Sequence, residues 1–360
     1  MPSSKHSSRL SFALTSTYWS QNSYASPKLQ RLGVLYPFRV PNSVRLPVEI
    51  TGAILARLDE GTLTQAALVS RLFRYECTRL LYRHVSRMAP RRSVMLIYTL
   101  ARSPELAACV RSYTISLKQA DPIGNLFRRL SKALSHMTNL RSLSFEIPGD
   151  KSWVLQGCSA NIRWFKTSLE FDDTLANWIS TKPLVRDLIL TRTKVFPLRP
   201  HELPNLGVIF GTPQAVLPAV IGRPVRSVCF GLNGPVTLDL SNLAETTVSV
   251  EHLGVAFDPL VWVEELNAID FIYRCSKFLP HIHKLSFFAT RSTFSQALYW
   301  LVAPLLARFN GLRYLQFVLG ESDFSLSINK LAQTELLRGF CGYCPLLRSV
   351  SFGNLTWNIE

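Results

Sequence analysis

Short segments of the form apolar-x-x-apolar-x-apolar recur along the chain and constrain its fold more than any other feature. We count nine of them, and only the fourth lacks its last apolar residue. At 47% apolar composition the bare pattern is common by chance, so the context of each copy carries the argument. Most copies follow Asn, Gly or Pro, residues that end helices. The first apolar residues of the nine segments are Val110, Leu140, Val185, Leu206, Val225, Val250, Ile282, Leu312 and Leu347.

Helical periodicity precedes two of these segments clearly. Apolar residues spaced three and four apart run from Ile123 to Met137 and from Phe294 to Phe309. Thr138-Asn139 ends the first stretch and Asn310-Gly311 ends the second, as expected at helix C-termini. A unit of helix, turn and strand cannot bury its apolar face alone, so we expect the units to stack on one another.

Stacked units of this kind predict an α/β fold for residues 87–360. We expect an irregular leucine-rich-repeat solenoid, with strands on its concave side and helices on its convex side. An ordinary α/β domain with a parallel sheet shows the same alternation and remains an alternative. The solenoid is favoured because the strand segments resemble one another and because no phosphate-binding turn is present.

Residues 46–86 have a different character. Periodic apolar residues predict one helix before Asp59-Glu60-Gly61, a second from Leu63 to Val69, and a third that Ser70 caps. A three-helix unit of this size buries little of its own surface. It contains more apolar residues than its core needs, so some of them should contact a partner or the first repeats.

The order of residues in this unit resembles an F-box. The resemblance rests on the Leu-Pro-x-Glu-Ile opening at residues 46–50 and on the Leu-Val-Ser-Arg-x-Phe-Arg segment at residues 68–74, and residues 81–85 extend it. It departs from the usual pattern at Thr64-Gln65-Ala66-Ala67, where bulkier apolar residues are common. The repeats beyond it resemble, more loosely, the divergent leucine-rich arrays of large fungal F-box families.

This resemblance implies a function. An F-box docks on a Skp-family adaptor, which links it to a cullin–RING ubiquitin ligase, and the repeats then present a protein substrate. The chain would be a non-enzymatic substrate-recognition subunit that needs no cofactor. A repeat scaffold whose F-box-like unit serves only for packing remains the alternative. Carried over by position, the adaptor contacts would be Leu46, Pro47, Ile50, Ile54, Leu55, Leu58, Leu63, Leu68, Val69 and Phe73.

The strand residues that alternate with buried ones should face the concave side. Only three of these residues are charged, namely Glu146, Asp187 and Lys284, and small residues dominate the rest. A substrate that is recognised by charge would need an arginine cluster among them, so we expect recognition by shape and apolar contact. The large candidates for substrate contact are Phe210, Phe288 and Tyr314.

The net charge of +16 is unevenly distributed along the chain. Residues 1–45 hold 6 basic and no acidic residues, and most of the remaining excess lies in residues 87–150. We interpret the first segment as a disordered Ser-rich tail and the second as solvated helix faces. Nucleic acid is therefore not the expected partner, although a nucleic-acid binder driven by residues 1–150 stays an alternative.

Motifs for catalysis and metal binding are absent from the sequence, which contains no P-loop, G-x-G-x-x-G, H-E-x-x-H or G-x-S-x-G. Cys341-Gly342-Tyr343-Cys344 is a lone C-x-x-C with no further ligands at zinc spacing. Asp172-Asp173 should cap a helix rather than hold a cation. We expect no catalytic residue and no metal, and an α/β enzyme with an unrecognised site remains an alternative.

Cysteine usage and hydropathy bear on location. The seven cysteines are odd in number and mostly unclustered, which is typical of free thiols in a reducing compartment. We therefore expect a cytoplasmic or nuclear protein. No apolar run approaches the ~18 residues that a membrane-spanning helix needs, so no membrane partner is expected.

Overall fold

The computed structural model describes residues 46–117, 125–191, 198–199, 201–234, 237–258, 262–289, 294–318, 330–353 and 355–359. Contacts within the chain separate a helical unit, which ends at Leu81, from a sheet unit, which begins at Tyr82. The tail that was expected over residues 1–45 lies outside the described residues.

The helical unit consists of three helices: α1 (Val48–Leu55), α2 (Glu60–Ala66) and α3 (Arg71–Leu81). Helix α2 begins one turn earlier than the expected start at Leu63. Asp59 does not merely break α1 but caps α2, because its Oδ1 accepts a hydrogen bond of 3.0 Å from the N–H of Thr62. The hydroxyl of Ser70 accepts a bond of 3.2 Å from the N–H of Phe73, which confirms the predicted cap of α3.

The sheet unit is built on a sheet of twelve described strands, whose order in space is their order in the sequence. Each of the first ten strands pairs in parallel with the next, and the last pair, β11 with β12, is antiparallel. The strands are β1 (His84–Val85), β2 (Ser112–Ser116), β3 (Ser142–Glu146), β4 (Trp164–Thr167), β5 (Asp187–Leu190), β6 (Val208–Gly211), β7 (Ser227–Gly231), β8 (His252–Phe257), β9 (Lys284–Ala289), β10 (Tyr314–Val318), β11 (Ser349–Phe352) and β12 (Leu355–Asn358).

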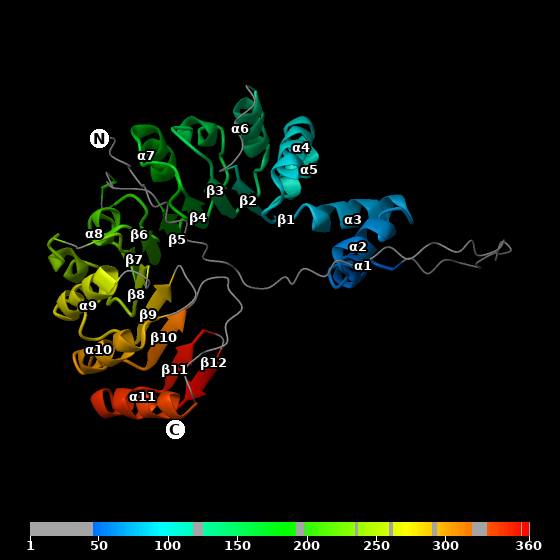
Figure 1. Cartoon of the computed structure of the whole chain (residues 1–360). Coiled ribbons are helices and arrows are strands. Elements are labelled where there is room, and N and C mark those ends of the chain that lie inside the picture. The colour runs from blue at the N-terminus through cyan, green and yellow to red at the C-terminus, as the bar shows by residue number, and fades with distance from the viewer. Residues whose placement is uncertain are drawn as a thin grey trace, which may run out of the picture. The chain divides into compact units, whose positions relative to one another are not determined.

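Helices lie between most consecutive strands and cover one face of the sheet. Within the sheet unit the strands line the inner side of a curve and the helices lie outside it (Figure 1). We call the inner surface the helix-free face, because no helix of the described residues covers it. None of the described helices is long and apolar enough to cross a membrane. The helices are α4 (Pro90–Arg102), α5 (Pro104–Cys109), α6 (Leu126–His136), η1 (Ser152–Leu155), α7 (Asp173–Ser180), α8 (Pro213–Val220), η2 (Ser241–Ala244), α9 (Trp262–Ser276), α10 (Gln296–Leu306) and α11 (Lys330–Tyr343).

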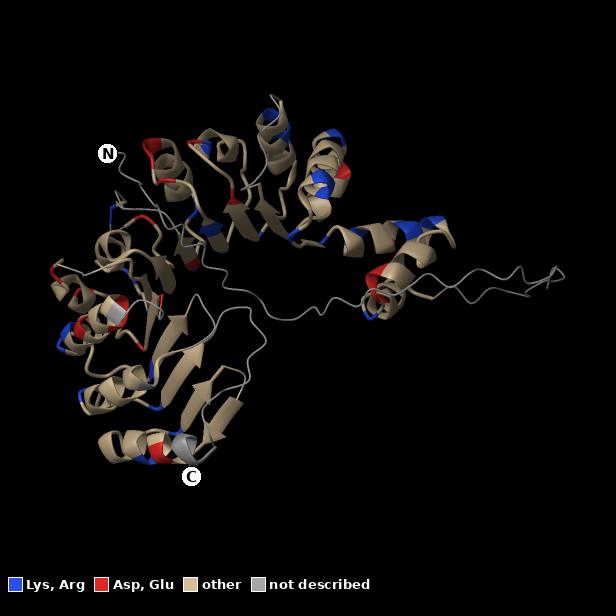
Figure 2. Ribbon diagram, in the orientation of Figure 1, with Lys and Arg blue, Asp and Glu red and all other residues tan. Residues whose placement is uncertain are grey.

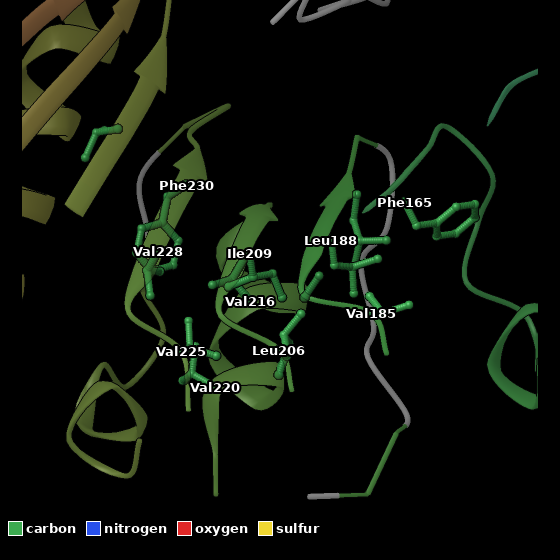
Figure 3. Packing of buried hydrophobic residues seen from close by; sticks show 14 of the residues in the cluster. Phe165, Val185, Leu188, Leu206, Ile209, Val216, Val220, Val225, Val228 and Phe230 are labelled. Atoms are coloured by element: carbon green, nitrogen blue, oxygen red, sulfur yellow. The ribbon is translucent and has the colours of Figure 1, made fainter. Parts of the chain in front are cut away.

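One hydrophobic core fills the space between the sheet and the helices, and it runs continuously from Val85 to Phe352. The first and fourth residues of each repeated segment point into it. Figure 3 shows this for Leu206 and Ile209, which lie beside Val216 and Val220 of α8, and all four side chains are buried. The alternation read from the sequence therefore marks the buried side of each strand.

Phenylalanine occupies the sixth position of several segments and forms a stack near the C-terminal end of the sheet. Phe287, Phe317 and Phe352 are register partners on β9, β10 and β11. The ring centroid of Phe317 lies 5.1 Å from that of Phe287 and 5.3 Å from that of Phe352, with nearly parallel planes. The three stacked rings therefore connect three consecutive repeats of the sheet unit.

The mixed α/β class is confirmed, and all nine predicted segments form strands, namely β2, β3 and β5–β11. The structure adds β4, which explains the long gap between Leu140 and Val185. Its segment starts at Ile162 and ends on the buried but polar Thr167, so the apolar pattern misses it. Strand β12 is also new, and it pairs antiparallel with β11.

Strand β1 changes the boundary between the units. The sequence placed residues 46–86 together and began the repeats at residue 87. In the structure Tyr82 starts a further copy of the repeat, His84 and Val85 pair with β2, and Val85 is buried in the core of the sheet unit. The copy was hidden because it overlaps the end of the F-box-like segment.

Candidate functional site

The helical unit has a small core of its own. Leu55, Leu63 and Cys77 are buried at its centre, and Leu58 and Phe73 are half-buried against them. Leu55 and Leu63 were expected to contact an adaptor. In the structure both side chains are buried and hold the three helices together, so they are not exposed at the surface for such a contact.

Most of the other predicted contact residues are exposed. Leu68 and Val69, in the turn between α2 and α3, are each 72% exposed, and Pro47 is exposed before α1. The structure adds Val48, Leu72 and Tyr75, which the resemblance did not supply. We call the exposed large apolar residues the apolar surface set, and its members are Leu46, Val48, Ile50, Ile54, Leu68, Val69, Leu72 and Tyr75.

The spacing of this set follows from helix geometry. Ile50 and Ile54 lie four residues apart on α1, and Leu72 and Tyr75 lie three apart on α3, so each pair shares a helix face. Such a spacing indicates that residues share a face, but it does not say whether the face is internal. For this reason the sequence could not separate the set from the core residue Leu55.

The departure from the usual F-box pattern at residues 64–67 also has a structural reading. Ala66 and Ala67 are half-buried and pack against the core of the helical unit, whereas Thr64 and Gln65 are exposed. The hydroxyl of Thr64 donates to the carbonyl oxygen of Glu60 at 2.8 Å. The small residues therefore allow close helix packing, and the polar pair lies at the surface.

The helix-free face of the sheet unit carries a second apolar cluster. Ile189, Phe210, Cys229 and Ala256 are buried in it, and Trp164 and Phe288 pack partly buried against them. Two of the three predicted substrate contacts, Phe210 and Phe288, thus meet in one cluster. Phe210 is only 4% exposed, so it is a packing residue and not a free contact surface.

Gly254 makes this cluster possible. A Cβ atom at this position would lie 2.5 Å from Sγ of Cys229 and 2.9 Å from Cε2 of Phe288. Side chains from the two neighbouring strands therefore occupy the space above the glycine, which a larger residue would displace.

Tyr314, the third predicted contact, lies apart from this cluster and is 45% exposed on β10. Beside it is a hollow of about 160 Å³. Polar groups dominate its walls, so the surface here is less apolar than expected. The lining residues are Lys284, Tyr314, Leu315, Gln316, Ser349 and Ser351.

Polar side chains on the helix-free face are connected across neighbouring strands. Nδ1 of His252 lies 2.9 Å from Oγ of Ser227, and Nε2 lies 2.9 Å from Oγ of Ser286. Burial, and then the charge of Lys284, lower the pKa of His252 to about 4. The imidazole is therefore neutral near pH 7, with one nitrogen donating and the other accepting.

A buried ion pair joins β3 and β4. Nζ of Lys166 lies 2.7 Å from Oε1 of Glu146, and both side chains are about nine-tenths buried. Glu146 was expected to be an exposed charge on the concave side. Lys166 was overlooked because the β4 segment was overlooked, so the pairing could not be foreseen.

The remaining sequence candidates for chemistry have structural roles. Asp172 caps α7, because its Oδ1 accepts from the N–H of Leu175 at 2.8 Å, which confirms the expected cap. Burial raises the pKa of the Cys341 and Cys344 thiols. No group of three or more metal-ligating side chains occurs in the part of the chain that the structure describes.

A larger hollow of about 580 Å³ lies between α7 and the turn after η1. The buried Lys182 lines it, and its Nζ donates to the carbonyl oxygen of Cys158 at 2.7 Å and lies 5.4 Å from the centroid of the Trp178 ring. Burial lowers the pKa of this lysine. These contacts connect α7 and the residues after it to the turn that follows η1.

Comparison with known families assigns one part of the chain. A family model described as F-box-like matches residues 44–88, a span that includes all three helices of the helical unit and β1. A search of curated proteins gives no match. The chain therefore contains an F-box-like domain at residues 44–88.

Proposed function

We propose that this chain is a substrate-recognition subunit of a Skp–cullin–F-box ubiquitin ligase. In this proposal the helical unit docks on a Skp-family adaptor, and the sheet unit binds a protein substrate. The observation that carries it is the apolar surface set, which belongs to a domain that matches the F-box-like family. F-box domains generally bind Skp-family adaptors.

The apolar surface set supports docking on physical grounds. Fully burying one leucine or isoleucine side chain stabilises a complex by roughly 1.5–3 kcal/mol. Burial of several members would outweigh the loss of translational and rotational freedom on association, which costs about 4–15 kcal/mol. A small unit that keeps eight large apolar side chains at its surface has the character of one half of an interface.

We further propose that the sheet unit is an irregular leucine-rich-repeat solenoid of the kind found in fungal F-box families. In its support, ten consecutive parallel pairings keep the same register between repeated segments, and one core runs through all of them. We keep Tyr314 and Phe288 as proposed substrate contacts, because Tyr314 is exposed and Phe288 is only half-buried. The subunit acts without catalysis or cofactor, in the cytoplasm or nucleus.

Adaptor docking is tested by co-purification of the full chain with a Skp-family adaptor. The double variant Leu46→Ala with Pro47→Ala should abolish co-purification, because both residues are exposed and contribute little to the internal core. A matched control is Leu346→Ala with Pro345→Ala, an exposed pair on the sheet unit. The control should bind the adaptor as the wild type does.

Two results would reject the proposal. Undiminished binding by the Leu46 and Pro47 variant would show that this surface does not carry the interaction. Failure of the folded wild-type chain to bind the adaptor would favour the alternative, a leucine-rich-repeat scaffold with no ubiquitin-ligase role.

A further inference from the structure

The second residue of every repeated segment lies at the edge of the sheet where the strands begin. From the second segment onward, the N–H of this residue donates to the carbonyl oxygen of its counterpart in the preceding segment, at 2.7–2.9 Å, so the residues form one continuous column. Eight of the eleven positions are arginine and none is lysine. We call this the edge column, and its members are Arg83, Arg111, Arg141, Arg163, Arg186, Gly207, Arg226, Glu251, His283, Arg313 and Arg348.

Five arginines follow one another without interruption in this column, each directly before one of the strands β1–β5. Arg141, Arg163 and Arg186 are exposed, and Arg83 and Arg111 are half-buried. Among the described residues, no carboxylate lies within ion-pair distance of the three exposed arginines. Basic residues recur in blue at the turns that lead into the strands (Figure 2). The column is thus a row of guanidinium groups on a fixed backbone.

The row produces a positive field along this edge. Neighbouring strands are about 4.8 Å apart, so five arginines extend over roughly 19 Å. Burial, and then the charges of Arg83 and Arg111, lower the pKa of His84, which directly follows the first arginine of the row. Like charges held this close repel one another, and a bound anion would relieve that repulsion.

We propose that the edge column over β1–β5 binds an extended, acidic segment of a protein. The proposal rests on the proposed function, because it names the class of substrate that the sheet unit would recognise. Arginine suits this task better than lysine, since its planar guanidinium binds a carboxylate through two parallel hydrogen bonds. An extended peptide rises about 3.4 Å per residue, so five or six residues span the row.

The structure favours a peptide over a nucleic acid. The row stops at Gly207, and farther along the column Glu251 places a carboxylate at the edge, 3.1 Å from Arg226. A nucleic-acid backbone is held by a longer positive track with aromatic rings for base stacking. A short row is enough for a peptide, whose apolar residues can also reach Trp164, next to Arg163.

The proposal is tested by fluorescence anisotropy of labelled decaglutamate with the purified full chain. The variant carries Arg141→Gln, Arg163→Gln and Arg186→Gln. The control carries Arg91→Gln, Arg92→Gln and Arg128→Gln, which are exposed on α4 and α6 and remove the same charge. We expect the variant to lose at least tenfold in affinity, the control to change by less than twofold, and wild-type binding to weaken with salt.

Several results would overturn the proposal. Failure of the wild-type chain to bind decaglutamate is one such result. A control that loses as much affinity as the variant is another, because it would mean that only net charge matters. Tighter binding of a ten-nucleotide single strand, lost in the variant, would assign the row to nucleic acid. Adaptor co-purification separates this proposal from the previous one, because the arginine variant should retain the adaptor and the Leu46→Ala, Pro47→Ala variant should retain decaglutamate.

Discussion

The two units of this chain use apolar residues in opposite ways. In the sheet unit nearly every repeated segment sends its first and fourth residues into one core that extends over all the repeats. In residues 46–81, the described part of the helical unit, only Leu55, Leu63 and Cys77 are fully buried among the apolar residues, and eight large apolar side chains are exposed. The difference indicates that the sheet unit completes its own core, whereas the helical unit leaves apolar surface for a partner.

The lengths of the elements explain this difference. The three helices of the helical unit have 8, 7 and 11 residues, and isolated helices of this length are marginal in water. The sheet unit also contains short elements, but each described strand between β1 and β12 is stabilised by two neighbours. Each repeat is therefore stabilised by packing on its neighbours, whereas the helical unit has to gain comparable stabilisation from a partner.

The largest expected effect tests whether the core of the sheet unit is continuous. Phe317→Ala removes the ring between Phe287 and Phe352 and should lower the free energy of unfolding of the sheet unit by about 4 kcal/mol. Tyr314→Ala on the same strand is the control and should have little effect, because Tyr314 is 45% exposed. Chemical denaturation measures both, and equal losses would contradict a core of this form.

An intermediate effect is expected at the buried ion pair of the sheet unit. Glu146→Leu should destabilise the unit by about 3 kcal/mol, because the charge of Lys166 stays buried without the carboxylate that it pairs with. Glu146→Leu combined with Lys166→Met should restore most of the loss. Denaturant unfolding of these two variants and of Lys166→Met alone measures the coupling, and a double variant that loses as much as the two single variants together would show that the pair does not interact.

The smallest effect concerns the stability of the sheet unit at acidic pH, which should depend on the buried His252. His252 has a pKa of about 4 in the folded sheet unit, against 6.5 ordinarily, so folding favours its neutral form. Its contribution is fully present above pH 6.5 and is lost as the pH falls toward 4, and the loss amounts to about 2 kcal/mol at pH 5. His252→Gln should remove this part of the pH dependence of thermal unfolding.

The matched control is His201→Gln at an exposed position. It should leave the pH dependence between 6.5 and 4 as it is in the wild type. A control that flattens the profile as much as His252→Gln would reject burial of His252 as the cause.

Much of the fold could be predicted because buried positions repeat. The apolar pattern located nine strands and missed two parallel ones for identifiable reasons. Thr167 is buried although it is polar, so the segment at Ile162 does not fit, and Tyr82 lies within the residues of the F-box resemblance. The antiparallel β12 belongs to no repeat, so a repeat pattern could not predict it.

The candidate sites were less predictable, because surface positions obey weaker rules. Residue order identified the helical unit, but it did not show that Leu63 packs inward while Leu68 is exposed. The edge column was missed because the second residue of each segment is not part of the apolar pattern. Only the pairing of the strands brings Arg141, Arg163 and Arg186 together. Charge that is dispersed in the sequence becomes a row in the folded sheet.

The most direct test of the account is hydrogen exchange of the full chain with and without a Skp-family adaptor. We predict that the adaptor slows amide exchange in residues 48–81, because docking stabilises helices that are marginal alone. Exchange in the core strands β5–β10 should not change. Protection that is absent from residues 48–81, or that is confined to the sheet unit, would contradict the claim that the helical unit is the docking half of this protein.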